Sequence, residues 1–98
     1  MVFEADTSLE IDDVRRIVES VLNDKLGRFG FARAEVEERR DEDDQRILFI
    51  RSVFGPVWSR FTGEESVLAI HQARLALLEK GEDRFPLIVH AFPQDKAA

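Results

Sequence analysis

A run of four acidic residues between two strand-like segments most constrains how this chain can fold. Phe31–Arg40 alternates apolar and charged side chains for most of its length, which is typical of a strand with one wet face. Gln45–Phe54 is a nearly continuous run of aliphatic and aromatic residues, as in a central strand. Asp41–Asp44 separates the two runs with residues that favour turns. Together these segments predict a β-hairpin.

Two helices are expected on either side of this hairpin. In Ser8–Leu26, apolar residues recur every three or four positions, which is the period of an amphipathic helix. A second helix is expected over Thr62–Lys80. Thr7 with Glu10, and Thr62 with Glu65, have the spacing of a capping box, in which each partner satisfies a backbone N–H of the first turn.

A third strand, Phe85–Phe92, follows the second helix, with Pro86 near its start. Because each helix is expected to have one apolar stripe, both should lie on the same face of the sheet. We therefore predict an α+β fold of order α-β-β-α-β. It is a two-layer sandwich with a three-stranded mixed sheet and the second strand in the middle. The 98 residues fit a single domain, with flexible ends at residues 1–6 and 93–98.

The composition argues against several function classes. The chain lacks cysteine, which excludes disulfides, thiol catalysis and cysteine-based zinc sites. With 20 acidic residues against 14 lysines and arginines, the net charge of −6 disfavours binding to nucleic acid or to a membrane surface. No apolar run approaches the roughly 18 residues of a membrane span, and no signal peptide is recognised at the start. A cytoplasmic protein is expected.

Motifs for metals, phosphates and nucleophilic catalysis are also missing from the sequence. The two histidines do not have the spacing of a metal site, and Glu37–Asp44 lacks the glycine and the final glutamate of a calcium loop. There is neither a nucleophile elbow nor a glycine-rich phosphate loop. We expect no cofactor and no metal, and a non-enzymatic protein is favoured.

One face of the predicted sheet has no helix to cover it. The second strand is expected to present Phe49 and Arg51 there, and the third Ile88, His90 and Phe92. A contiguous exposed apolar patch usually marks an interface, so this face is a candidate surface for a protein partner or a second copy. Two alternatives stay open: a loop or tail covers the face, or a register shift of one residue turns these side chains inward. The first strand adds charge to the same face through Arg33, Glu35, Glu37 and Arg39.

The loop between the second strand and the second helix contains the sole tryptophan, Trp58, two residues before Arg60. Tryptophan and arginine are enriched at binding hot spots, so both residues are candidates for partner binding. Alternatively, Trp58 covers one end of the core. In either case Arg60 is expected to stack on the Trp58 ring.

His71 and Arg74 form a candidate polar pair on the second helix. They are three residues apart and fall inside its expected apolar arc. A histidine beside a guanidinium suits a general base next to an anion site. The alternative is a wide apolar helix whose rim carries both side chains. That arc contains Val67, Ile70, Leu75, Leu77 and Leu78.

The order of elements resembles a type II KH domain in which the central pair of helices is reduced to one. KH domains clamp nucleic-acid backbone with a GXXG loop between those helices. The GXXG pattern occurs here as Gly27-Arg28-Phe29-Gly30, but it follows the first helix. The second helix is not interrupted by such a loop. The resemblance therefore concerns topology, and no binding residue is carried over. Glu35–Phe49 and Gly81–Pro86 also look like parts of small bacterial α-β-β-α-β domain proteins, which implies no activity.

Three hypotheses follow. The first is a protein-interaction or self-associating domain, such as a homodimer, that uses its open sheet face. The second is a nucleic-acid binder that relies on local arginines, and the third is a small enzyme around His71 and Arg74. The arginines of the second hypothesis are Arg28, Arg33, Arg39 and Arg51.

Overall fold

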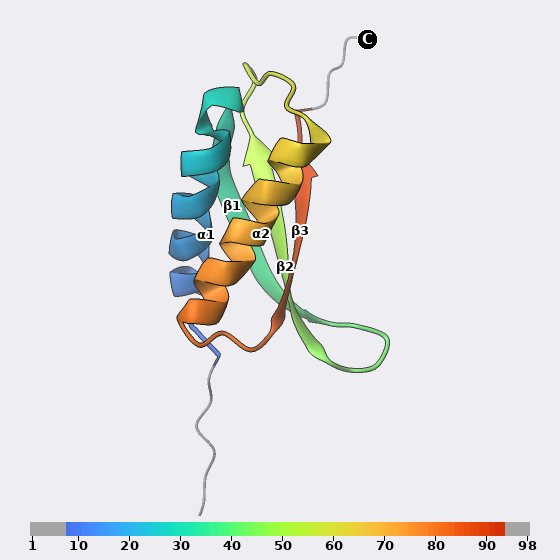
Figure 1. The fold of residues 1–98 in the computed structure, drawn as a ribbon. Helices are drawn as coiled ribbons and strands as arrows, with labels where there is room; N and C mark the ends of the chain where they lie inside the picture. The colour runs from blue at the N-terminus through green and yellow to red at the C-terminus, as the bar shows by residue number, and fades with distance from the viewer. Residues whose placement is uncertain (1–7, 94–98) are drawn as a thin grey trace, which may run out of the picture.

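The computed structural model describes residues 8–93 and confirms the predicted α+β sandwich (Figure 1). The sheet has the order β1-β2-β3, with β1 and β2 antiparallel and β2 and β3 parallel. The second strand is central, as predicted. The elements are α1 (Ile11–Leu26), η1 (Gly27–Phe29), β1 (Phe31–Arg40), β2 (Arg46–Phe54), α2 (Gly63–Glu79) and β3 (Phe85–Ala91).

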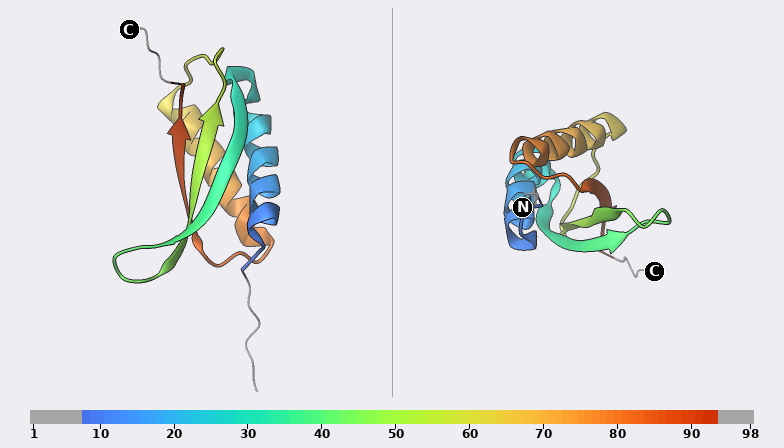
Figure 2. Two further views of the ribbon diagram at one scale, coloured as in Figure 1. Left: turned by 180° about the vertical axis from the view of Figure 1, so that it is seen from behind. Right: turned by 90° about the horizontal axis from the view of Figure 1, so that it is seen from below.

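Both helices cover the same face of the sheet, as the two views of Figure 2 show. The core lies between the layers, where α1 contributes a stripe of side chains four residues apart. Leu48 and Ile50 of β2 meet this stripe and are fully buried. Each such aliphatic side chain contributes roughly 1.5–3 kcal/mol on burial. The α1 stripe consists of Val14, Val18, Leu22 and Leu26.

The start of α1 differs from the prediction. The helix begins at Ile11, with Glu10 as an N-cap that makes no side-chain hydrogen bond, so the expected start at Ser8 is wrong. The backbone of Leu9 instead hydrogen-bonds to side chains of the segment that connects α2 to β3, which is distant in sequence. Its N–H donates to Glu82 Oε1 (2.8 Å), and its carbonyl accepts from Arg84 Nη2 (2.6 Å).

The cap of α2 follows the prediction. Thr62 Oγ1 accepts from the N–H of Glu65, and Glu65 Oε1 accepts from the N–H of Thr62, which confirms the second capping box. The first predicted box needs Thr7, which lies outside the described residues. The expected flexible ends, residues 1–6 and 93–98, lie outside them too, apart from Pro93.

The structure corrects the predicted orientation of α2. Of the predicted arc, Leu77 is buried and Ile70 packs against the core, but the other buried positions are Ala69 and Ala73, which lie outside the arc. The two alanines, one helical turn apart, leave room for α1 to pack closely against α2. Val67 and Leu78, which belong to the predicted arc, are 67% and 66% exposed.

A buried ion pair in the segment between α2 and β3 joins three parts of the fold. Glu82 and Arg84 are only 4% and 7% exposed. Arg84 Nε donates to Glu82 Oε2 (2.8 Å), and Arg84 Nη1 donates to Glu38 Oε1 of β1 (2.7 Å). Burial by itself would raise the pKa of Glu82. Hydrogen bonds from the Arg84 side chain and from the N–H groups of Leu9 and Arg84 outweigh that effect and lower the pKa to about 2.

Candidate interaction surface

The faces of β3 are reversed relative to the prediction. Ile88 is 6% exposed and lies in the core, and His90 turns towards α2. The parallel register explains this, because Ile88 lies beside the buried Ile50 and His90 beside the buried Ser52, and paired residues share a face. The one-residue alternative is therefore the correct one for this strand. The exposed side chains of β3 are Phe85, Leu87 and Val89.

The far face of the sheet presents Phe49 and Arg51 as predicted, but arginines and glutamates lie over its β1 half. The Arg39 guanidinium lies 3.8 Å from the centre of the Phe49 ring. Arg51 Nε lies 3.5 Å from Glu35 Oε1. Within residues 8–93, no helix lies on this face (Figure 2). Its exposed apolar side chains are therefore those that β3 adds.

The outer edge of β3 is blocked at one point by an arginine from α2. Arg74 Nε donates to the carbonyl of Pro86 (3.0 Å), and its guanidinium lies 4.7 Å from the centre of the Phe85 ring. Proline has no N–H to donate, so Pro86 suits a position that faces away from β2. Backbone groups alternate between the two sides of a strand, so those of Ile88 and His90 also point to the outer edge.

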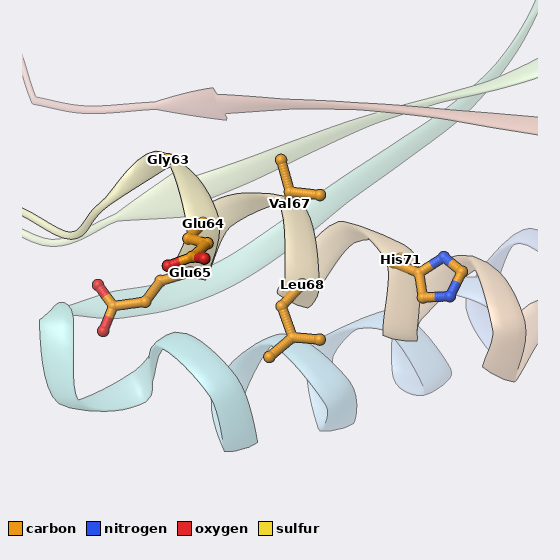
Figure 3. A pocket seen from close by; sticks show the side chains of 6 residues that line it. All are labelled: Gly63, Glu64, Glu65, Val67, Leu68 and His71. Carbon is orange, nitrogen blue, oxygen red and sulfur yellow. The ribbon is translucent and has the colours of Figure 1, made fainter.

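The outer face of α2 carries further exposed apolar side chains, and Leu78 of this helix lines one hollow with Phe85 of β3. In Figure 3, Val67 points towards β3 and Leu68 towards α1, with His71 one turn further along the helix. These side chains border an open hollow of about 590 Å³ together with the first turn of α2. We call the exposed apolar side chains of both elements the α2–β3 surface; they are Val67, Leu68, Leu75, Leu78, Phe85, Leu87 and Val89.

Four of the predicted partner-binding residues meet at the end of β3, around a hollow of about 310 Å³: Trp58, Arg60, His90 and Phe92. The Trp58 and Phe92 rings are 4.3 Å apart. Trp58 packs on Phe92 and is still 36% exposed. It therefore covers one end of the core, as one interpretation predicts, and keeps one side accessible, as the partner-binding interpretation requires. Arg60 does not stack on Trp58, so that expectation is wrong: the stacked guanidinium groups of the described residues are those of Arg28, Arg39 and Arg74.

A close approach to Gly30 fixes the position of the Trp58 loop. Gly30 has a φ of +101°, and a Cβ there would lie 2.7 Å from Trp58 Cα. The N–H of Ser59 donates to the carbonyl of Phe29 (2.9 Å) in the same region. A side chain at position 30 would therefore be strained and would displace the loop.

His90 pairs with a serine that sequence analysis missed. Its Nε2 lies 2.8 Å from Ser66 Oγ, and its ring contacts Phe54 and Phe61 edge-on. Burial lowers the pKa of His90, which favours the neutral ring. The buried Nδ1 has no hydrogen-bond partner among the described residues. The Ser66–His90 contact joins β3 to α2.

His71 and Arg74 do not form the predicted pair. His71 is exposed beside Val67 and Leu68, whereas Arg74 reaches over to Pro86 and Phe85. The two side chains therefore line different hollows, and the structure does not bring them together in one pocket. Among residues 8–93, no group of three or more His, Cys, Asp or Glu side chains is arranged to hold a metal ion.

The sequence matches no known protein family and no curated protein. In the described part of the chain, neither helix combines the length and the apolar character that crossing a membrane requires. The function therefore has to be argued from the chemistry of the α2–β3 surface.

Proposed function

We propose that this protein is a non-enzymatic interaction domain and that it binds a protein partner through the α2–β3 surface. One observation carries the proposal. Of the eleven large hydrophobic side chains that are exposed among the described residues, four belong to α2 and three to β3, which makes seven on this surface. Apolar patches that persist on a folded domain usually mark a place where another molecule binds.

The charge of this surface favours a protein over a nucleic acid. Between Ser66 and Leu78 the charged side chain is Arg74, and Phe85–Pro93 contains neither acids nor lysine or arginine. Arg74 is already engaged with Pro86 and Phe85. A nucleic-acid site would need several free cations for the phosphates. A cytoplasmic location stays a prediction from the sequence.

The test is to place a charge on this surface. In Leu78→Glu the carboxylate points into solvent in the free protein, so the fold should persist, but it would be buried without a partner in a complex. Wild-type protein is examined for complexes both alone, by light scattering, and with candidate partner proteins, by sedimentation. We expect a complex that Leu78→Glu weakens at least tenfold.

The matched control is Val57→Glu, because Val57 is 89% exposed in the Trp58 loop, away from the α2–β3 surface. It adds the same charge and should leave the complex unchanged. The proposal is wrong if the wild type forms no complex, or if the two variants weaken the complex equally.

A further inference from the structure

We propose that the partner is a second copy of this chain, and that the two copies join by antiparallel pairing of their β3 edges. The three strands of each copy would then form one continuous sheet. This inference rests on the proposed function and names the partner for the same surface. Three observations support it: the outward-pointing backbone groups of β3, the lack of acidic residues in β3, and the position of α2 beside β3.

The backbone of β3 has the geometry for this pairing. An unpaired strand edge is a template for another strand. Arg74 occupies the carbonyl of Pro86, but the N–H and C=O groups of Ile88 and His90 also point to the outer edge, and no other described strand pairs there. A two-fold axis at Val89 places Ile88 of each copy opposite His90 of the other. Each copy then supplies two donors and two acceptors, and none of these bonds needs Pro86.

Symmetry is the reason to prefer a second copy as the source of the added strand. Antiparallel pairing about a two-fold axis makes one edge complementary to itself, as in the isologous interfaces of most dimers. Val89 would meet Val89 of the other copy at the axis, with Leu87 beside it on the far face of the sheet. These side chains are apolar and exposed in the single chain.

Charge supports the same choice. Each chain carries a net charge of −6, so two copies repel one another over most of their surfaces. Phe85–Pro93 has no charged side chain apart from the titratable His90, and Ser66–Leu78 contains no acid. His71 and Arg74 of α2 lie on this side. Carboxylates lie at both ends of the region, Glu64 and Glu65 in the first turn of α2 and Glu82 and Asp83 before β3. Two copies can therefore pair along β3 without an acidic side chain of either strand facing the other.

The exposed face of α2 fits the same arrangement. At about 100° per residue, Val67 and Leu78 lie within about 40° of Arg74 around the helix, and Arg74 is the residue that contacts β3. Leu78 and Phe85 also line one hollow together with Arg74. Pairing of the β3 edges would bring this part of α2 towards the other copy and remove its apolar side chains from water.

The absence of cysteine makes a direct test available. In Val89→Cys, the introduced thiols of the two copies would face each other at a non-hydrogen-bonded pair. The Cα atoms of such a pair are about 4.5 Å apart, and disulfides span about 4.4–6.8 Å. The control is Val57→Cys, whose thiol is more exposed and lies away from the pairing edge. Under mild oxidation of the full chain, Val89→Cys should form covalent dimers at least tenfold faster than the control.

Light scattering of the wild type separates this inference from the proposed function. A dimer, with rapid cross-linking of Val89→Cys, supports both. If the wild type is a monomer and Leu78→Glu weakens its complex with another protein, the second copy is not the partner. The proposal of an interaction domain is then still supported. A dimer that Leu78→Glu disrupts, but in which Val89→Cys and Val57→Cys cross-link at equal rates, overturns pairing of the β3 edges alone.

Discussion

The two helices lie side by side on one sheet face, yet their outer surfaces are opposite in character. The outer face of α1 is a network of ion pairs, in which Arg15 contacts Asp12 (2.6 Å) and Glu19 (3.1 Å). The outer face of α2 carries Val67 and Leu78 without an acid between Ser66 and its last turn. A helix in water needs only one apolar face to pack on a core. The second apolar face of α2 is exposed in the described part of the chain, and the proposed interface is based on it.

The two edges of the sheet differ in the same way. On β1, the Ala34 N–H is occupied by the Glu19 carboxylate (2.9 Å), and charged side chains such as Arg33 and Glu35 line the strand. These features protect an edge from pairing with another chain. On β3, protection is limited to the contact of Arg74 with Pro86, and the side chains that follow are apolar. The protein thus has a protected side, α1 with β1, and an unprotected side, α2 with β3.

The largest expected effect comes from two adjacent leucines that occupy opposite faces of α2. Leu77 is 1% exposed, so Leu77→Ala should lower the free energy of unfolding by about 2–5 kcal/mol through the cavity it leaves. Leu78→Ala removes the same atoms from an exposed position and should change the stability of the monomer by no more than about 0.5 kcal/mol. Urea unfolding at low protein concentration measures both. Equal losses would show that α2 is rotated from the orientation described.

A somewhat smaller loss of stability is expected when the pH is lowered, because the Glu82 carboxylate of the buried ion pair with Arg84 is then protonated. The pKa of Glu82 is lowered from 4.5 to about 2, so the folded state favours its charged form. The resulting stability is fully present above the unfolded pKa of about 4.5 and is lost as the pH falls towards 2, by up to about 3 kcal/mol. Unfolding free energies measured between pH 6 and pH 2 test this.

The control for the pH experiment is Glu82→Gln, which has no carboxyl group to titrate at this position. Its stability should be lower at pH 6 and should fall less steeply towards pH 2 than that of the wild type. Parallel pH profiles for the two proteins would assign the acid sensitivity to other carboxylates.

The smallest predicted effect compares the two helix caps. Thr62→Ala removes the hydroxyl that accepts from the N–H of Glu65 and should cost about 1 kcal/mol. Glu10 makes no side-chain cap, so Glu10→Ala should cost only a few tenths of that amount. Thermal unfolding of the two variants measures the difference. A larger loss for Glu10→Ala would mean that the cap of α1 is stronger than its hydrogen bonds indicate.

Sequence reasoning recovers the features that depend on neighbours along the chain. The ends of β1, the position of β2 and the capping box of Thr62 with Glu65 follow from local patterns of apolar, turn-forming and capping residues. The orientation of α1 also follows, because this helix has one apolar stripe and one charged face. In each case nearby residues allow one arrangement and exclude the others.

The features that sequence reasoning missed depend on residues far apart in the chain. His90 was expected on the open sheet face, but it faces α2, where Ser66 lies within hydrogen-bond distance of its Nε2. The burial of Glu82 and Arg84 is not predicted, because the Leu9 backbone and Glu38, which complete their hydrogen bonds, are distant in sequence.

The sequence by itself therefore determined the elements, their order and the burial of α1, because the periodicity of side chains is local information. Only the tertiary structure decided which face of α2 is buried and which face of β3 points outward. Both elements are apolar on two faces, so hydrophobicity does not choose between them. The choice is made by the fit of Ala69 and Ala73 against α1 and by the register of Ile88 beside Ile50.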